Sequence, residues 1–245
     1  MATIREDGGD GGDGGDGANG SDESGGSDGS KEIDRFDGGV GWIAEPDEDL
    51  QRASHALVVD GDVWVIDPVD TADLDRRLDE LGDVAGVVVL LDRHERDADA
   101  VARRHDVAVH LPHQLHAIAD DFDVRVETFE TELADTGYRS VPVVTNRLWR
   151  EVALYEENEG TLVVPEALGA IDAFRAAGER LGVHPALRLV PPRTALGGLR
   201  PERVLVGHGA GISEDARSAF QDALDGARPR APGLYLRVAR EALGV

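Results

Sequence analysis

The stretch VVVLLDRHERDADAVARRHDVAVHLP, residues 87–112, decides the fold expected for this chain. It opens with five consecutive branched aliphatic residues, which is typical of a buried strand. A short polar segment follows, and residues 97–104 carry small apolar side chains at helical spacing, ahead of a second short strand over residues 107–110. The order strand, polar loop, helix, strand is typical of α/β folds, and it puts the polar loop at a strand end, where functional residues tend to lie.

The sequence on either side predicts further strands in pairs. Residues 55–67 form two β-rich runs around an Asp-Gly-Asp turn, and residues 152–164 form a second pair around a Glu- and Gly-containing turn; both patterns indicate hairpins. The spacing of apolar residues predicts helices over residues 168–174, after Ser213, and over residues 234–243. Hairpins interleaved with helices predict α/β layers with mixed sheets.

The N-terminal segment differs in composition from the rest. Residues 1–32 are rich in Gly, Asp and Ser and nearly free of apolar side chains. Such a segment buries too little area to offset its ordering entropy, so we expect a disordered acidic tail. Residues 33–245 are expected to form a single domain.

Charge and composition exclude several classes of protein. The chain carries 49 Asp and Glu residues against 25 Lys and Arg residues, a net charge of −24, and Lys31 is its one lysine. This balance predicts adaptation to a cytoplasm of very high salt, as in halophilic organisms, and disfavours nucleic acid and anionic membranes as partners. The absence of cysteine excludes disulfides and thiolate metal sites;. No segment has the pattern of a signal peptide or membrane span, so a cytoplasmic location is expected.

Two histidines follow predicted strands. His94 lies between Asp92 and Asp97, and an imidazole with two carboxylates is a donor set for a divalent cation;. The alternative is a polar strand end leading into a helix, with Asp97 at the helix N-terminus. His208 lies between two glycines, which allow a ligand to approach closely;. It is equally well interpreted as a loop histidine that binds nothing.

Four stretches, in chain order, resemble the metallo-β-lactamase fold superfamily. They are HALVVDGDVWVIDPVD (55–70), the opening stretch above (87–112), EVALYEENEGTLVVPEAL (151–168) and PERVLVGHG (201–209). The resemblance spans about residues 40–225. It implies a four-layer αββα sandwich with two mixed β-sheets.

The same resemblance implies a degenerate set of metal ligands. Members usually carry His-x-His-x-Asp-His, and the matching residues 92–97 here are DRHERD. His94 keeps the second histidine, and Asp92 and Asp97 stand at histidine positions. By the resemblance, Glu166 stands at the bridging acidic position and His208 at the last histidine.

The two remaining motif positions also lack a usual metal ligand. Arg96 takes the place of the motif aspartate, and Asn146 or Arg147 takes the place of the middle histidine. Arginine stays protonated and has no lone pair to donate to a metal. We therefore hypothesise that Arg96, alone or with Arg147, replaces the metal by ion pairing with the neighbouring carboxylates.

Two functions follow from these observations. The first is a chain that has lost the usual dinuclear zinc hydrolysis, binds no cofactor and has a non-catalytic or cryptic role. The alternative is a metal-dependent hydrolase of a small-molecule ester, thioester, lactone or phosphoester. It would hold one divalent metal (Zn, Mn or Fe) through Asp92, His94, Glu166 and His208. A different α/β fold with an unassigned role also stays open, and the sequence does not determine the oligomeric state.

Overall fold

The computed structural model describes residues 29–243. Most of the predicted acidic tail, residues 1–28, lies outside the described residues. The first strand begins at Lys31, so residues 31 and 32, assigned to the tail from the sequence, belong to the folded domain. No helix within the described range is long and apolar enough to cross a membrane.

The first sheet has seven strands in chain order. They are β1 (Lys31–Phe36), β2 (Gly39–Ile43), β3 (Ala53–Val59), β4 (Asp62–Ile66), β5 (Asp83–Val88), β6 (Val109–Pro112) and β7 (Val126–Phe129). The first four are antiparallel neighbours, and β4 to β7 are parallel. Helices α1 (Leu74–Asp79) and α2 (Ala98–His105) and the 3₁₀ helix η1 (His113–Asp121) connect the parallel strands.

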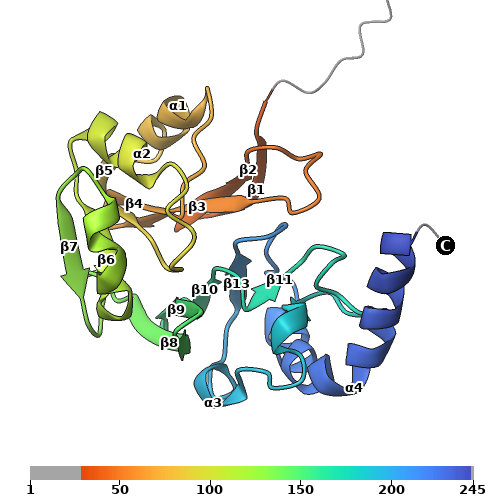
Figure 1. Cartoon of the computed structure of the whole chain (residues 1–245). Coiled ribbons are helices and arrows are strands. Elements are labelled where there is room, and N and C mark those ends of the chain that lie inside the picture. The colour runs from red at the N-terminus through yellow and green to blue at the C-terminus, as the bar shows by residue number, and fades with distance from the viewer. Residues whose placement is uncertain (1–28, 244–245) are drawn as a thin grey trace, which may run out of the picture.

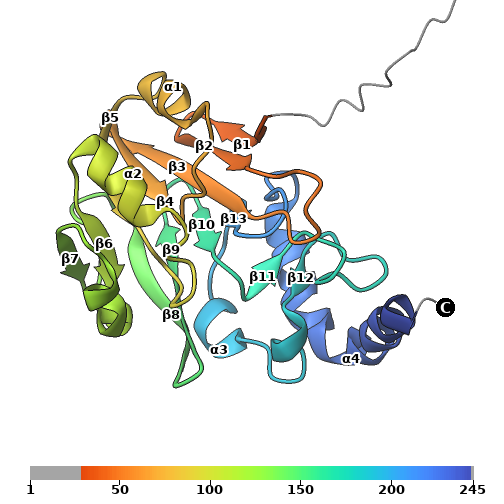
Figure 2. The ribbon, with the colours of Figure 1, turned by 45° about the horizontal axis from the view of Figure 1, so that its top comes forward.

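The second sheet has four strands in the order β13 (Arg203–Val206), β10 (Thr161–Val164), β9 (Trp149–Glu156) and β8 (Arg139–Asn146). β10 is parallel to β13, and the other pairs are antiparallel. A two-stranded ribbon of β11 (Leu168–Gly169) and β12 (Gly182–Val183) lies beside the last helix, α4 (Ala216–Leu243) (Figure 2). Between them in sequence are η2 (Pro185–Leu187) and α3 (Arg193–Leu196).

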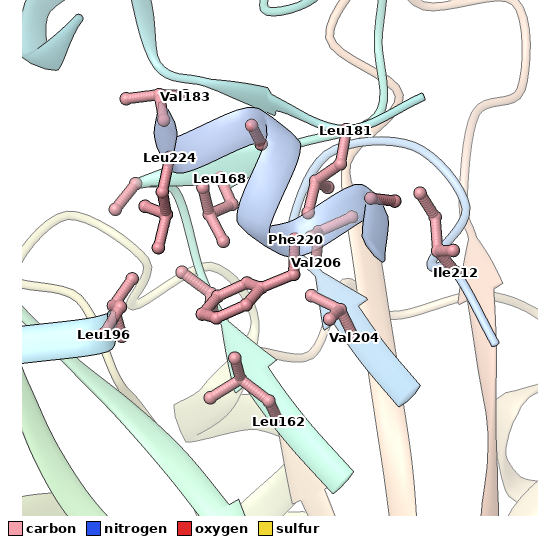
Figure 3. Close-up of a cluster of buried hydrophobic side chains, with 14 of the residues drawn as sticks. Leu162, Leu168, Leu181, Val183, Leu196, Val204, Val206, Ile212, Phe220 and Leu224 are labelled. Carbon is pink, nitrogen blue, oxygen red and sulfur yellow. The ribbon is translucent and has the colours of Figure 1, made fainter. Parts of the chain in front are cut away.

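Three apolar clusters define the layers, which run from top to bottom in Figure 1. One joins α1 and α2 to the first sheet through residues such as Leu78, Val101 and Val87. A second fills the space between the sheets, and a third joins the second sheet to α4, where Phe220 packs against Leu162 and neighbouring residues (Figure 3). The predicted α/β class with a four-layer αββα sandwich and two mixed sheets is therefore confirmed.

Local patterns located the hairpins correctly. At the turn between β3 and β4, Asp60 and Gly61 both have positive φ, which Gly and Asp tolerate best;. The helix predicted over residues 168–174 is wrong, because Leu168 and Gly169 pair with β12 as a strand. The two helices predicted after Ser213 and over 234–243 are parts of the single helix α4, which contains two prolines.

A fully buried ion pair fixes the segment between β11 and α3. Arg188 and Glu179 form a salt bridge with no exposed surface on either side chain. Arg188 also donates to the backbone oxygens of Phe174 and Ala227, at 2.6 and 3.3 Å, so it ties this segment to α4. Two buried charges with this many partners form a unit whose members depend on each other.

Replacing Glu179 by Leu is expected to lower the free energy of unfolding by about 3–5 kcal/mol, because Arg188 then remains buried without its carboxylate. The double variant Glu179→Leu/Arg188→Met should recover part of this loss, since both charges are gone. Urea denaturation at constant molar KCl measures both values. A double variant less stable than the single one would contradict the prediction.

Candidate functional site

The candidate ligands lie where strands of both sheets end. Val164 of β10 pairs with Val206 of β13, and Glu166 and His208 each lie two residues beyond this pair. Both residues therefore lie beyond the C-terminal ends of two parallel, neighbouring strands of the second sheet. His94 lies in the loop between β5 and α2 of the first sheet. Parallel strands that end at one edge bring their loops together, and here they meet at the seam between the sheets.

His94, Glu166 and His208 form a group suited to a metal ion. Each offers one ligand atom, and these atoms lie within 4.8 Å of one another. The Nδ1 atom of His94 lies 3.1 Å from Asp67 Oδ2, and Nδ1 of His208 lies 2.9 Å from the backbone oxygen of Leu50. A neutral imidazole that donates from Nδ1 carries its lone pair on Nε2. Both histidines are therefore oriented as metal-ligating histidines usually are, with the outer nitrogen held by an oxygen acceptor.

Glu166 is the centre of charge in this group. His94 Nε2 lies 3.5 Å from Glu166 Oε2, and Arg93 lies 3.0 Å from Glu166 Oε1. Burial raises the pKa of Glu166, but His94 and Arg93 outweigh that effect and bring it to about 2. Burial lowers the pKa of His208 to about 4, against an opposing contribution from its hydrogen bond with Leu50. Glu166 is thus an anion and His208 a neutral base near neutral pH.

The other two predicted ligands have backbone partners instead. Asp92 accepts a hydrogen bond from the N–H group of Arg150 at 2.9 Å, and Asp97 accepts one from the N–H group of Asp70 at 2.9 Å. Neither belongs to the group formed by the two histidines and Glu166. The structure therefore brings together three of the five predicted ligands and holds the other two at loop junctions.

Arg96 lies near the site but does not make the expected ion pairs. Its guanidinium group donates to the backbone oxygens of Ala53, Asp67 and Gly207 at 2.6, 2.8 and 3.3 Å. These oxygens lie at the start of β3 and just after β4 and β13. Arg96 has a φ of 43°, so the chain turns here and the side chain runs to the strand ends. The hypothesis of carboxylate pairing by Arg96 is wrong in its choice of partners.

Arg147 has no part in this group. It is exposed in the turn between β8 and β9, next to Asn146, whose side chain caps the same turn. The arginine that contacts Glu166 is Arg93. Arg93 stands at a position that the His-x-His-x-Asp-His motif leaves unspecified, so no sequence signal marked it.

Further residues around Glu166 were also missed. Glu151 is fully buried and accepts hydrogen bonds from the backbone N–H groups of Glu166 and Ala167 and from Trp149 Nε1. Burial raises the pKa of Glu151 to about 7. His184 Nε2 lies 3.5 Å from Glu166 Oε1. The charge of Glu151 within an apolar strand was a usable signal, but nothing local in the sequence marked His184.

Replacing Arg96 by Met should lower the free energy of unfolding by about 2–4 kcal/mol, because three buried carbonyl groups lose a charged donor. Arg147→Met is the matched control, since it removes the same charge from an exposed turn and should change stability by less than about 0.5 kcal/mol. Urea denaturation at constant salt compares the two variants. Equal effects would show that Arg96 has no special structural role.

His208 is expected to make the metal-free protein less stable in acid. Its pKa is about 4 in the folded chain and 6.5 without the fold. Between these values the unfolded state binds the proton and the folded state does not, so stability falls as the pH falls, by up to about 3 kcal/mol. In chelator-treated protein at fixed KCl, His208→Gln should lose less stability than wild type between pH 7 and pH 4.5. The same loss in both proteins would refute this assignment.

Comparison with known proteins supports the architecture. No family model matches the sequence, and no curated protein matches it significantly. Solved structures do match its fold. A diflavin flavoprotein fragment from Nostoc sp. PCC 7120 is 12% identical with a TM-score of 0.57, covering 85% of this chain and 98% of that one. The chemotaxis sensor ODP from T. denticola is 13% identical with a TM-score of 0.55, over 81% of this chain and 95% of that one.

The DIM-1 metallo-β-lactamase also matches. It is 11% identical with a TM-score of 0.52, and the match covers 81% of this chain and 98% of that one. Identities this low carry information about the fold alone. The protein therefore has the metallo-β-lactamase fold, with a His94, Glu166 and His208 group at the seam between its two sheets.

Proposed function

We propose that this chain has lost the two-metal centre typical of the metallo-β-lactamase superfamily that it resembles. It keeps a single-metal site for hydrolysis of a small-molecule ester, thioester, lactone or phosphoester. The ligands are Nε2 of His94, a carboxylate oxygen of Glu166 and Nε2 of His208. One observation carries the proposal. Both Nδ1 atoms face oxygen acceptors, so each neutral ring carries its lone pair on Nε2, and that of His94 faces the Glu166 carboxylate within a group whose ligand atoms all lie within 4.8 Å of one another.

This arrangement of lone pairs calls for a cation. With Nδ1 of His94 donating to Asp67, its Nε2 lone pair faces Glu166 Oε2 at 3.5 Å. Two electron-rich atoms at this distance repel each other unless a proton or a metal ion lies between them. Two imidazoles and one carboxylate form a common donor set for Zn, Mn or Fe, with room for further ligands.

A second metal has little support from the neighbouring residues. Asp92 and Asp97 accept hydrogen bonds from backbone N–H groups. Arg96 stands at the position where the resembled motif has an aspartate. It carries a positive charge and donates to carbonyl groups at strand ends. A permanent cation at this place disfavours another divalent ion beside it.

The chain's own residues prepare the site in identifiable ways. A bound divalent metal supplies Lewis acidity, which lowers the pKa of water and polarises a scissile carbonyl or phosphoryl group. Asp67 fixes the tautomer and orientation of His94, and its other oxygen accepts the Leu90 N–H group at 2.9 Å;. The Glu151 carboxylate accepts hydrogen bonds from the backbone N–H groups of Glu166 and Ala167 and so fixes the backbone of Glu166. Arg93 contacts Glu166 Oε1 and leaves Oε2 facing His94.

A metal-free, non-catalytic role is the second candidate, and one observation favours it. Arg93 and His94 both contact Glu166, so its charge already has partners within the chain. In that case a proton on His94, and not a metal ion, lies between His94 and Glu166. The fold would then serve as a binding or regulatory module.

Metal content separates the two candidates. Untagged protein purified in molar KCl without chelator should contain about one Zn, Mn or Fe ion per chain by mass spectrometry, as expected for one set of three ligands. His208→Ala should abolish binding, and Asp92→Asn should retain it, because Asp92 lies outside the ligand group. Loaded wild-type protein should hydrolyse at least one compound in a panel of the four substrate types.

Two results would contradict the proposal. Protein that contains no metal and takes none up on titration with Zn²⁺, Mn²⁺ or Fe²⁺ would favour the metal-free candidate. Metal retained fully in His208→Ala would show that any bound ion lies elsewhere.

A further inference from the structure

The open edge of the candidate site is formed by two nitrogen donors. The side chains of His94 and Glu166 are 7% and 12% exposed, whereas those of Arg93 and His184 are 39% and 22% exposed. Arg93 and His184 are therefore more accessible to a ligand from solvent than the buried His94 and Glu166. Any recognition of a substrate at this edge depends on the chemistry of these two side chains.

Both donors converge on one point. Arg93 Nη2 lies 3.0 Å from Glu166 Oε1, and His184 Nε2 lies 3.5 Å from the same oxygen. The backbone N–H group of Ala186 donates to His184 Nδ1 at 3.2 Å, so in the neutral ring the proton is on Nε2, towards Glu166;. The two groups thus present N–H donors from different segments to one place beside the metal ligands.

An aromatic side chain holds both donors in position. The guanidinium carbon of Arg93 lies 4.3 Å from the centre of the Trp149 ring, and the His184 ring meets Trp149 nearly perpendicularly at a centroid distance of 4.9 Å. Phe174 contacts His184 from a second direction, at 4.7 Å. Trp149 is fixed by the hydrogen bond from its Nε1 to the buried Glu151 carboxylate, at 2.8 Å. A stacked guanidinium loses little entropy when it binds a ligand.

Arg93 keeps donors for a ligand. A guanidinium group has five N–H bonds. Its carboxylate neighbours in the described part of the chain are Glu166 at 3.0 Å and Asp92 at 3.5 Å. With one N–H bond directed to each of these two carboxylates, three N–H bonds remain for another acceptor;. The chain has a net charge of −24, so its surface is solvated mainly by carboxylates. An arginine stacked on Trp149 is better explained by a binding role than by surface solvation.

We propose that Arg93 and His184 form an oxyanion subsite, and that the substrate carries a carboxylate or phosphate group that binds there while its scissile bond lies at the metal site. The inference rests on the proposed hydrolase for its substrate, but the subsite itself consists of residues that need no metal. The planar fork of Arg93 fits two oxygens of either anion. The single N–H of neutral His184 faces Glu166 Oε1, so it reaches the anion as a hydrogen bond shared with that oxygen;. Neutral esters and lactones without an acidic group are then poor substrates.

Anion binding tests the subsite directly. Inorganic phosphate and acetate are titrated separately into wild-type protein at fixed molar KCl, once metal-loaded and once chelator-treated, with calorimetry as the readout. Phosphate, acetate or both should bind to the metal-loaded and to the chelator-treated protein. The anion with the lower dissociation constant identifies the class of oxyanion that the subsite prefers. Arg93→Gln should weaken that binding by about tenfold or more, because a charge-assisted pair of hydrogen bonds is lost. His184→Phe should weaken it less, by about threefold or more.

Arg150→Gln is the matched control. Arg93 approaches Oδ1 of Asp92, whereas Nη1 of Arg150 lies 4.0 Å from Oδ2 of the same carboxylate, and Arg150 is 36% exposed. The substitution removes the same charge from the same neighbourhood, so binding should change by less than about twofold. Arg93→Lys keeps the charge but not the planar fork, and it should restore only part of the affinity. Near-ultraviolet circular dichroism shows whether each variant is folded.

The outcomes distinguish this inference from the proposed hydrolase. Anion binding that depends on Arg93 in protein without metal supports the subsite even if the metal proposal fails. Metal binding with no anion binding, or with equal losses in Arg93→Gln and Arg150→Gln, overturns the subsite and leaves the metal proposal standing.

Discussion

The contact between the Arg96 guanidinium group and three strand-end carbonyls is the constraint on which the site depends. Through Ala53 and Asp67 it holds two strands of the first sheet, and through Gly207 it holds the end of β13 in the second. Two sheets packed only through apolar side chains can slide without losing much contact area. Directional hydrogen bonds from one charged group remove that freedom, because each carbonyl oxygen must stay within about 3 Å of its donor. Asp67 and His208 lie directly at these fixed points.

Charge balance in a poorly hydrated place explains the residue types at the seam. Glu166 and Asp67 are two acidic groups that both contact His94. Arg93 contacts the Glu166 carboxylate, and Arg96 donates to the backbone oxygen of Asp67. Burial of an unpaired charge costs several kcal/mol, so each of these groups must have a partner. The pairs are not equivalent, however. The terminal nitrogens of Arg96 donate to backbone oxygens, whereas Arg93 stays partly exposed against Trp149.

The layer formed by the second sheet and α4 supports the site from the other side. Arg188, buried with Glu179, donates to the backbone oxygen of Phe174. The Phe174 ring in turn contacts the rings of His184 and His208. The ion pair beneath the segment therefore positions two imidazoles without touching Glu166. The stability of this segment therefore depends on the buried Arg188–Glu179 pair, whereas the polar groups around Glu166 stay available to a ligand.

The sequence by itself determined the layers and part of the site. Alternating and continuous apolar runs locate strands because burial on one or both faces leaves a local pattern, and the Asp60–Gly61 turn specifies its hairpin through backbone conformation. His94, Glu166 and His208 were found because each follows such a strand and the order of strands resembles a known fold. The same approach failed for residues 168–174, where pairing with a strand more than ten residues away overrides a helical spacing.

Only the tertiary structure decided which polar groups meet. Asp92 and Asp97 lie beside His94 in sequence, yet their carboxylates are taken up by backbone N–H groups of Arg150 and Asp70. Arg93 and His184 are separated by ninety-one positions and converge on one oxygen of Glu166. The side chains of neighbouring residues need not point the same way. Their directions depend on backbone dihedral angles such as the positive φ of Arg96;. Contacts between distant segments depend on how the two sheets pack, and no local pattern encodes that packing.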